Sequence, residues 1–160
     1  MIFLTVGSHE PFDRLIAAMD QWCVRNPGLE VFGQITDRSA YRPQNFAFVG
    51  QLDAASYRQK CLEARCLVSH AGMGSIITAL DLSKPIVILP RRGHLQETRN
   101  DHQYATAREF RDKPGIFLAE DESHLDAAMA RALSPEGKGG ANAPFAQDRL
   151  IRFLADMARG

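Results

Sequence analysis

Phosphate-binding chemistry is suggested first by residues 70–75, whose sequence is HAGMGS. The run follows a short apolar segment and precedes one with helical periodicity. Glycines let a ligand approach the backbone closely, and the free amides at a helix start attract anions. Ser75 adds a hydroxyl, and His70 adds a ring donor or a positive charge. The alternative is a tight strand-to-helix turn in which His70 bonds only to backbone.

A second polar cluster, Glu97 to Gln103, has the paired donors and acceptors that sugar hydroxyls require. Its structural alternative is a helix N-cap, in which Asn100 or Asp101 accepts from the first amides. The two roles are compatible, because such a cap leaves His102 and Gln103 free to face a ligand.

A third cluster, residues 7–10 (GSHE), follows the first apolar run. His9 is a candidate base, a phosphate ligand or an ordinary loop residue. The sequence has no H-E-x-x-H metal motif, G-x-S-x-G elbow or P-loop. Residues 72–77 are also a poor dinucleotide fingerprint, because Ile77 takes the place of the last small residue. The three cysteines, Cys23, Cys61 and Cys66, match no zinc spacing, so we expect reduced thiols.

Strand and helix signals alternate along the chain. Short apolar runs predict strands at 2–6, 29–35, 46–49, 66–68, 85–89 and 115–118. Periodic segments predict helices over 15–23, 53–64, 72–82, 99–110 and 122–133. This alternation predicts an α/β fold with a doubly wound parallel sheet. Ligands of such sheets bind beyond the carboxyl ends of the strands, where the three polar clusters all fall.

The composition is that of an ordinary globular protein. The chain has 160 residues, 45% hydrophobic and 24% charged, with 19 basic and 19 acidic residues. The zero net charge argues against a nucleic-acid footprint. The sequence has no signal peptide features and no apolar run near the ~18 residues of a membrane span. We predict a ligand-binding domain over residues 1–133, a linker at 134–143 and an amphipathic helix at 144–160.

Five segments in order resemble a known family: residues 3–8 (FLTVGS), 12–15 (FDRL), 69–75 (SHAGMGS), 84–90 (KPIVILP) and 100–103 (NDHQ). They resemble the C-terminal, donor-binding half of glycosyltransferase family 28. More closely, they resemble the small catalytic subunits of two-part glycosyltransferases. These include the subunit that adds the second N-acetylglucosamine to dolichol-linked oligosaccharide, and PssE-like subunits of bacterial exopolysaccharide assembly.

The resemblance implies a single Rossmann-like domain, one half of a GT-B fold, that binds a UDP-sugar as substrate without cofactor or metal. It implies a catalytic role for His70, and the position of His9 in the first loop makes His9 a further catalytic candidate. The loop at 48–53 would hold the uracil. The substrate-binding residues it implies are Gly7, Ser8, Gly72, Gly74, Ser75, Thr78, Glu97, Asn100, Asp101, His102 and Gln103. His70, Gly72, Gly74 and Ser75 would face the diphosphate, and Asn100, His102 and Gln103 would face the sugar. Thr78 stands where many relatives have a ribose-binding Glu, and it can make only weaker contacts.

The resemblance also implies a partner. A membrane-anchored subunit would bind a polyprenyl-linked saccharide acceptor, so this chain would be cytoplasmic and peripheral to the membrane. The 144–160 helix would dock on that partner or fold back on its own sheet. Arg91, Arg92 and Arg99 would suit a sugar carboxylate, but glucuronic acid, glucose and N-acetylhexosamine donors all stay open. A non-catalytic nucleotide-sugar-binding module is the alternative function. A two-domain epimerase is disfavoured by the length.

Overall fold

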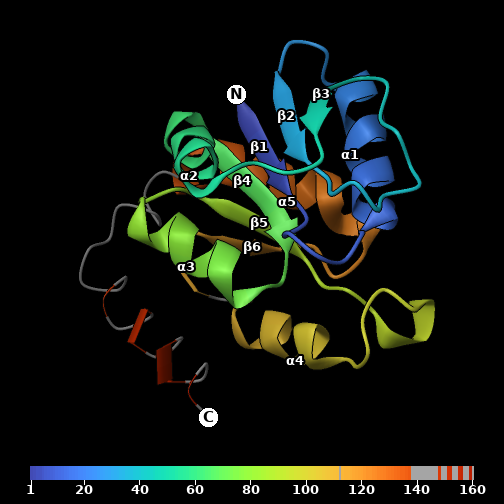
Figure 1. Cartoon of the computed structure of the whole chain (residues 1–160). Coiled ribbons are helices and arrows are strands. Elements are labelled where there is room, and N and C mark those ends of the chain that lie inside the picture. The colour runs from blue at the N-terminus through green and yellow to red at the C-terminus, as the bar shows by residue number, and fades with distance from the viewer. Residues whose placement is uncertain (112, 138–147, 149–150, 153–154, 157–158, 160) are drawn as a thin grey trace.

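The fold is a parallel sheet with helices on both faces (Figure 1). The computed structural model describes residues 1–111, 113–137, 148, 151–152, 155–156 and 159. Six strands pair in the order β3-β2-β1-β4-β5-β6, and every pairing is parallel. The strands are β1 (Ile2–Thr5), β2 (Val31–Gln34), β3 (Ala47–Val49), β4 (Cys66–His70), β5 (Ile86–Leu89) and β6 (Ile116–Leu118).

The helices are α1 (Asp13–Arg25), α2 (Ala54–Glu63), α3 (Met73–Asp81), α4 (His102–Glu109) and α5 (Leu125–Leu133). Two 3₁₀ turns, η1 (Gly93–Leu95) and η2 (Glu122–His124), precede α4 and α5. Asp53 caps α2 by accepting from the Ser56 amide at 2.7 Å, which fixes where that helix begins.

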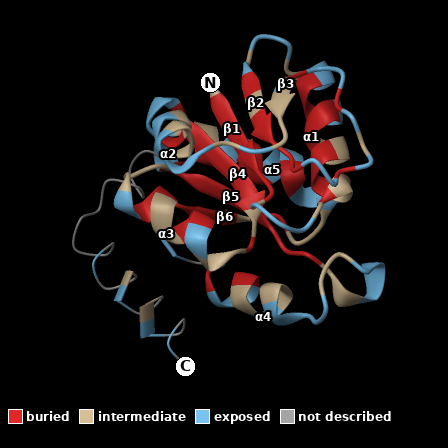
Figure 2. Ribbon diagram, in the orientation of Figure 1, coloured by how far each residue is buried: buried red, intermediate tan, exposed pale blue. Residues whose placement is uncertain are grey.

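Two apolar clusters fill the two faces of the sheet, which is the most buried part of the fold (Figure 2). Ile2 and Leu4 of β1 pack with α1 and α5, whereas Phe3 between them packs with α2, α3 and α4. This alternation follows from the two-residue period of a strand. Both faces of β1 are therefore buried, as expected of a central parallel strand.

The predicted α/β doubly wound sheet is confirmed, and its strands lie close to the predicted ranges. The helix predicted from residue 99 begins at His102 instead, after the unpredicted turn η1. The strand predicted over 66–68 extends to His70.

The predicted linker at 134–143 and helix at 144–160 lie mostly outside the described residues. Within them, residues 135–137, 148, 151–152, 155–156 and 159 are helical. Ile151 packs against the apolar cluster of α2, α3 and α4.

Candidate functional site

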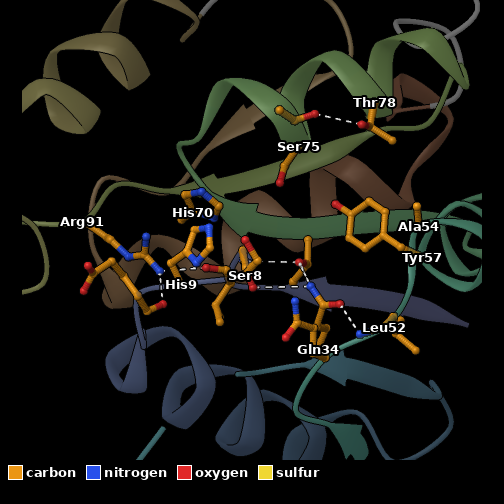
Figure 3. Close-up of a pocket in the computed structure, with 16 residues that line it drawn as sticks. Ser8, His9, Gln34, Leu52, Ala54, Tyr57, His70, Ser75, Thr78 and Arg91 are labelled. Carbon is orange, nitrogen blue, oxygen red and sulfur yellow. Dashed lines mark hydrogen bonds between the residues drawn. The ribbon is translucent and has the colours of Figure 1, made fainter. Parts of the chain in front are cut away.

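A cavity of about 640 Å³ opens at the carboxyl edge of the sheet (Figure 3). It lies where the strand order reverses between β1 and β4, the position at which doubly wound sheets bind ligands. Its walls come from the ends of β1, β2, β4 and β5 and from the starts of α2 and α3. The lining residues are Thr5, Val6, Gly7, Ser8, His9, Glu10, Gln34, Gln51, Leu52, Ala54, Tyr57, His70, Gly74, Ser75, Thr78 and Arg91.

The start of α3 faces this cavity without a side-chain cap. Gly72 is the N-cap and supplies no side-chain cap, and the first turn contains no acidic residue. Gly74 and Ser75, which belong to the first turn of α3, line the cavity. Thr78 donates its hydroxyl to the Gly74 carbonyl at 2.8 Å, which leaves its oxygen able to accept from a ligand. The positive end of the helix dipole therefore faces the cavity.

His70 stands at the cavity wall between two glycines. A Cβ added at Gly72 would lie 2.1 Å from His70 Nε2, and one at Gly7 would lie 3.2 Å from Cε1. His70 Nδ1 lies 3.2 Å from Ser69 Oγ. Burial, together with the charge of Arg91, lowers the pKa of His70 to about 4. The imidazole of the ligand-free chain is therefore neutral at pH 7, a state in which it can act as a hydrogen-bonding group.

Gln34, buried at the end of β2, joins two rims of the cavity. Its Oε1 accepts from the Leu52 amide at 2.9 Å, and its Nε2 donates to Thr5 Oγ1 at 3.3 Å and to the Gly7 carbonyl at 3.4 Å. The sequence analysis missed this residue. The available signal was a polar residue inside an apolar strand, which is costly to bury unless it is bonded.

The predicted site residues fall into two groups. The first group consists of the predicted residues that line the cavity: Gly7, Ser8, His9, His70, Gly74, Ser75 and Thr78. Gly72 does not line the cavity itself but caps α3 and flanks His70. The remaining predicted residues, between 97 and 103, do not line it.

Glu97 is engaged within the protein. It holds Arg14 of α1 through both oxygens, with Arg14 Nη2 to Oε1 at 2.9 Å and Nε to Oε2 at 3.0 Å. It also accepts from the Arg92 amide at 3.0 Å. These contacts fasten the loop after β5 to α1.

The other acceptors of this segment serve the same loop. Asp101 Oδ1 accepts from the Gly93 amide at 2.9 Å, and Asn100 Oδ1 accepts from the His102 amide at 3.0 Å. Gln103 Oε1 accepts from the amide of Arg91 at 3.2 Å. Asn100 also lines a neighbouring cavity of about 540 Å³ that shares Glu10 with the first. Sugar contacts from residues 100–103 stay a prediction.

The described part of the chain shows neither a cluster of metal-ligating side chains nor a helix suited to span a membrane. There, no three His, Cys, Asp or Glu side chains gather closely enough to hold a metal ion. None of its helices is long and apolar enough to cross a bilayer.

The fold is a Rossmann-like α/β domain, with a cavity and an uncapped helix start at the switch point of the sheet. The chain belongs to the glycosyltransferase family 28 C-terminal domain family, whose pattern it matches over residues 1–138. It is therefore homologous to the nucleotide-sugar-binding halves of glycosyltransferases. A comparison with curated proteins finds no match.

Solved structures with the same fold are GT-B glycosyltransferases. The glycosyltransferase of kitacinnamycin is 17% identical with a TM-score of 0.69, over 99% of this chain and 42% of that one. The Streptomyces sp. SF2575 glycosyltransferase SsfS6, solved with thymidine diphosphate, is 18% identical with a TM-score of 0.63, over 97% and 40%. An anthocyanidin 3-O-glucosyltransferase solved with UDP is 12% identical with a TM-score of 0.62, over 97% and 35%. The chain thus spans about two fifths or less of the length of these three proteins.

Proposed function

We propose that this chain is the donor-binding half of a GT-B glycosyltransferase and that its substrate is a UDP-linked hexose. The observation that carries the proposal is the cavity at the β1–β4 switch point, into which the uncapped start of α3 opens. Membership of family 28 supports a transferase. Two proteins of the same fold were solved with nucleoside diphosphates, one with thymidine diphosphate and one with UDP.

In this proposal the diphosphate lies at the start of α3. The amides of Gly74 and Ser75 and the Ser75 hydroxyl donate to it, and neutral His70 adds a ring donor. These groups are fixed by the fold before the ligand arrives. They stabilise the negative charge that grows on the departing diphosphate, so no divalent cation is needed.

The nucleoside would extend toward β2 and β3. The backbone around Leu52, held by Gln34, offers polar groups to the uracil edge. Thr78, half-buried on α3, offers a single hydroxyl oxygen to the ribose. The donor sugar would then point toward residues 7–10 and 100–103, where His9 is exposed and available to take a proton.

The acceptor would be bound by a second, membrane-anchored chain, as in PssE-like exopolysaccharide assembly, with a polyprenyl-linked saccharide as acceptor. Support comes from the resemblance of residues 69–75 and 100–103 to the small subunits of two-part glycosyltransferases. The helices described here offer no membrane span of their own. We therefore place the chain in the cytoplasm, peripheral to the membrane through its partner.

Calorimetry of UDP binding, with and without EDTA, tests the donor site. We expect binding in both conditions, and loss of binding in EDTA would overturn the metal-free proposal. A ranked thermal-shift screen of UDP-sugars then identifies the donor, since the tightest ligand stabilises most. Absence of UDP binding under all conditions contradicts the proposed function.

A transfer assay tests the partner. The chain is incubated with a radiolabelled UDP-sugar and membranes that contain or lack the candidate subunit. We expect lipid-linked product only with the subunit present, because the acceptor must be held in line with the anomeric carbon. Transfer by the chain alone would contradict the split enzyme. Binding without transfer in either case would favour the non-catalytic module.

A further inference from the structure

Arg91, which follows β5 directly, is a buried cation in the wall of the cavity. It is only 5% exposed, yet it is one of the residues that line the cavity. Its Nη2 donates to the carbonyls of Val6 at 2.7 Å and Glu10 at 2.6 Å, and its guanidinium lies 5.1 Å from the centre of the Phe12 ring. Its Nε is buried and has no hydrogen-bond partner among the described residues.

This guanidinium has no ion-pair partner within the described chain. None of the described carboxylates lies within 4.0 Å of its nitrogens. Glu10 and Glu97 are the acids near enough to act on it, and the Glu97 carboxylate is already bound to Arg14. Burial lowers the pKa of Arg91, but an arginine still keeps its charge at neutral pH. A buried cation without a counter-ion is costly, which points to an anion that arrives with the ligand.

The charge of Arg91 acts on the same part of the cavity as the helix start. His70 lies between them: it precedes α3 in the chain, and the charge of Arg91 contributes to lowering its pKa. Figure 3 shows the guanidinium beside the two histidines, on the wall away from Tyr57. The cavity therefore has two sources of positive potential, the dipole of α3 and the side chain that follows β5.

We propose that Arg91 is a substrate-binding residue that supplies the counter-charge for the diphosphate of the bound nucleotide sugar. This inference rests on the proposed function. The two carbonyl contacts hold the guanidinium in place before the ligand binds, so little side-chain freedom is lost on binding. The unpaired Nε is the group whose surroundings change when an anion enters.

The competing explanation is structural: Arg91 would only fasten residues 6–10 to the end of β5. The substitution Arg91→Gln removes the charge and keeps a donor for the carbonyls, whereas Arg91→Lys keeps the charge. Arg92→Gln is the matched control, since Arg92 does not line the cavity and donates to the Glu120 carbonyl.

The experiment compares UDP with uridine, which has the same nucleoside and no phosphate. For Arg91→Gln we expect UDP binding roughly 10- to 100-fold weaker, in line with the loss of a charged hydrogen bond, with uridine affinity unchanged. Arg91→Lys should retain most UDP affinity, and Arg92→Gln all of it. Equal weakening of UDP and uridine in both Arg91 variants, or no weakening, would overturn the inference.

A measurement on the unsubstituted protein covers the case in which Arg91→Gln does not fold. In ¹⁵N-labelled protein, the Arg91 Nε–H resonance should shift on addition of UDP and stay in place with uridine. An unchanged resonance at saturating UDP overturns the role of Arg91 and leaves the donor site intact. If the protein binds no UDP at all, the proposed function itself fails.

Discussion

At the scale of single residues, Gly72 and Gly74 of the same turn have different structural roles. Gly72 has φ −92° and ψ 140°, a conformation open to any residue, so its small size is what matters. The imidazole of His70 occupies the space that a Cβ would need. Gly74 has nothing within 4 Å of an added Cβ, so the folded chain itself does not require a glycine there. Gly72 leaves room for His70, and in the proposed complex Gly74 would leave room for the ligand.

Gly72→Ala should therefore destabilise the protein by roughly 2–3 kcal/mol, because His70 must move or the turn must shift. Gly74→Ala should keep or raise the melting temperature, since alanine favours a helix, while UDP binding weakens. Thermal melts and calorimetry of both variants check this. The double variant Gly72→Ala with His70→Ala should regain stability relative to Gly72→Ala. Without such recovery, His70 is not the reason for the glycine.

Residue types and order were enough to predict most of the cavity wall, because glycines, serine and histidine cluster beyond two apolar runs. They indicated Arg91 only as one of three arginines that would suit a sugar carboxylate, and they did not point to Gln34. The roles of these two residues depend on contacts with Val6, Glu10 and Leu52, which lie 18 to 85 positions away in the sequence. The neutral state of His70 could not be predicted from the sequence either, because it depends on burial and on the charge of Arg91.

At the scale of elements, the loop between β2 and β3 is fastened to α1 by a buried carboxylate. Asp20 is 1% exposed and accepts from Tyr41 Oη at 2.8 Å, from the Asn45 amide at 2.8 Å and from the Gln44 amide at 3.1 Å. Burial alone would raise the pKa of Asp20, but the hydrogen bonds from Tyr41, Asn45 and Gln44 outweigh it and hold the pKa below 3.8. The charged Asp20 side chain of α1 therefore fixes the path of this loop.

Asp20→Asn should lower the free energy of unfolding at pH 7 by roughly 2–4 kcal/mol, because an amide places a donor against donors. The folded pKa lies below the unfolded one, so the stabilisation is complete above about pH 4 and is lost as the pH falls through the folded pKa. Urea unfolding from pH 7 down to pH 2 measures both effects. The difference in unfolding free energy between Asp20→Asn and the unsubstituted protein should shrink at the lowest pH values. A difference that does not depend on pH would contradict the role of the Asp20 charge. Tyr41→Phe should cost about 1 kcal/mol.

Elements themselves were largely predictable, because continuous apolar runs specify buried parallel strands. The start of α4 was not predictable from periodicity. Asn100 and Asp101 use their side chains to bond the amides of His102 and Gly93, so residues 99–101 form a turn instead of helix. Local side-chain bonds of this kind compete with helical ones.

At the scale of the whole molecule, the cavity is built from residues 5 to 91, well before the end of the described chain. Beyond α5, Ile151 packs on the apolar cluster formed with α2, α3 and α4. This contact favours attachment of that segment to its own domain, one of the two roles considered from the sequence. Ile151 does not itself line the cavity, although α3 contributes residues to both the cavity wall and the cluster that Ile151 contacts.

A chain that ends at residue 137 should accordingly bind UDP with unchanged affinity and melt several degrees lower. Loss of about 1–2 kcal/mol of apolar burial corresponds to roughly 2–4 °C for each kcal/mol at this size. Ile151→Asp should reproduce much of the drop, whereas Arg159→Ala, an exposed control, should not. Differential scanning fluorimetry measures the melting temperature, and calorimetry measures the UDP affinity. An unchanged melting temperature would instead leave the segment free to dock on a partner.

The division between sheet and cavity also has an evolutionary consequence. The cavity wall is made mostly of loops and helix starts that extend from separate strands, while the two apolar clusters lie along the strands and helices themselves. A sequence change in one of these loops alters ligand recognition and leaves the packed interior largely untouched. Under the proposed function, exchanging single loops between family members would therefore change donor preference and keep the scaffold. The same architecture can in this way diversify its chemistry much faster than its fold.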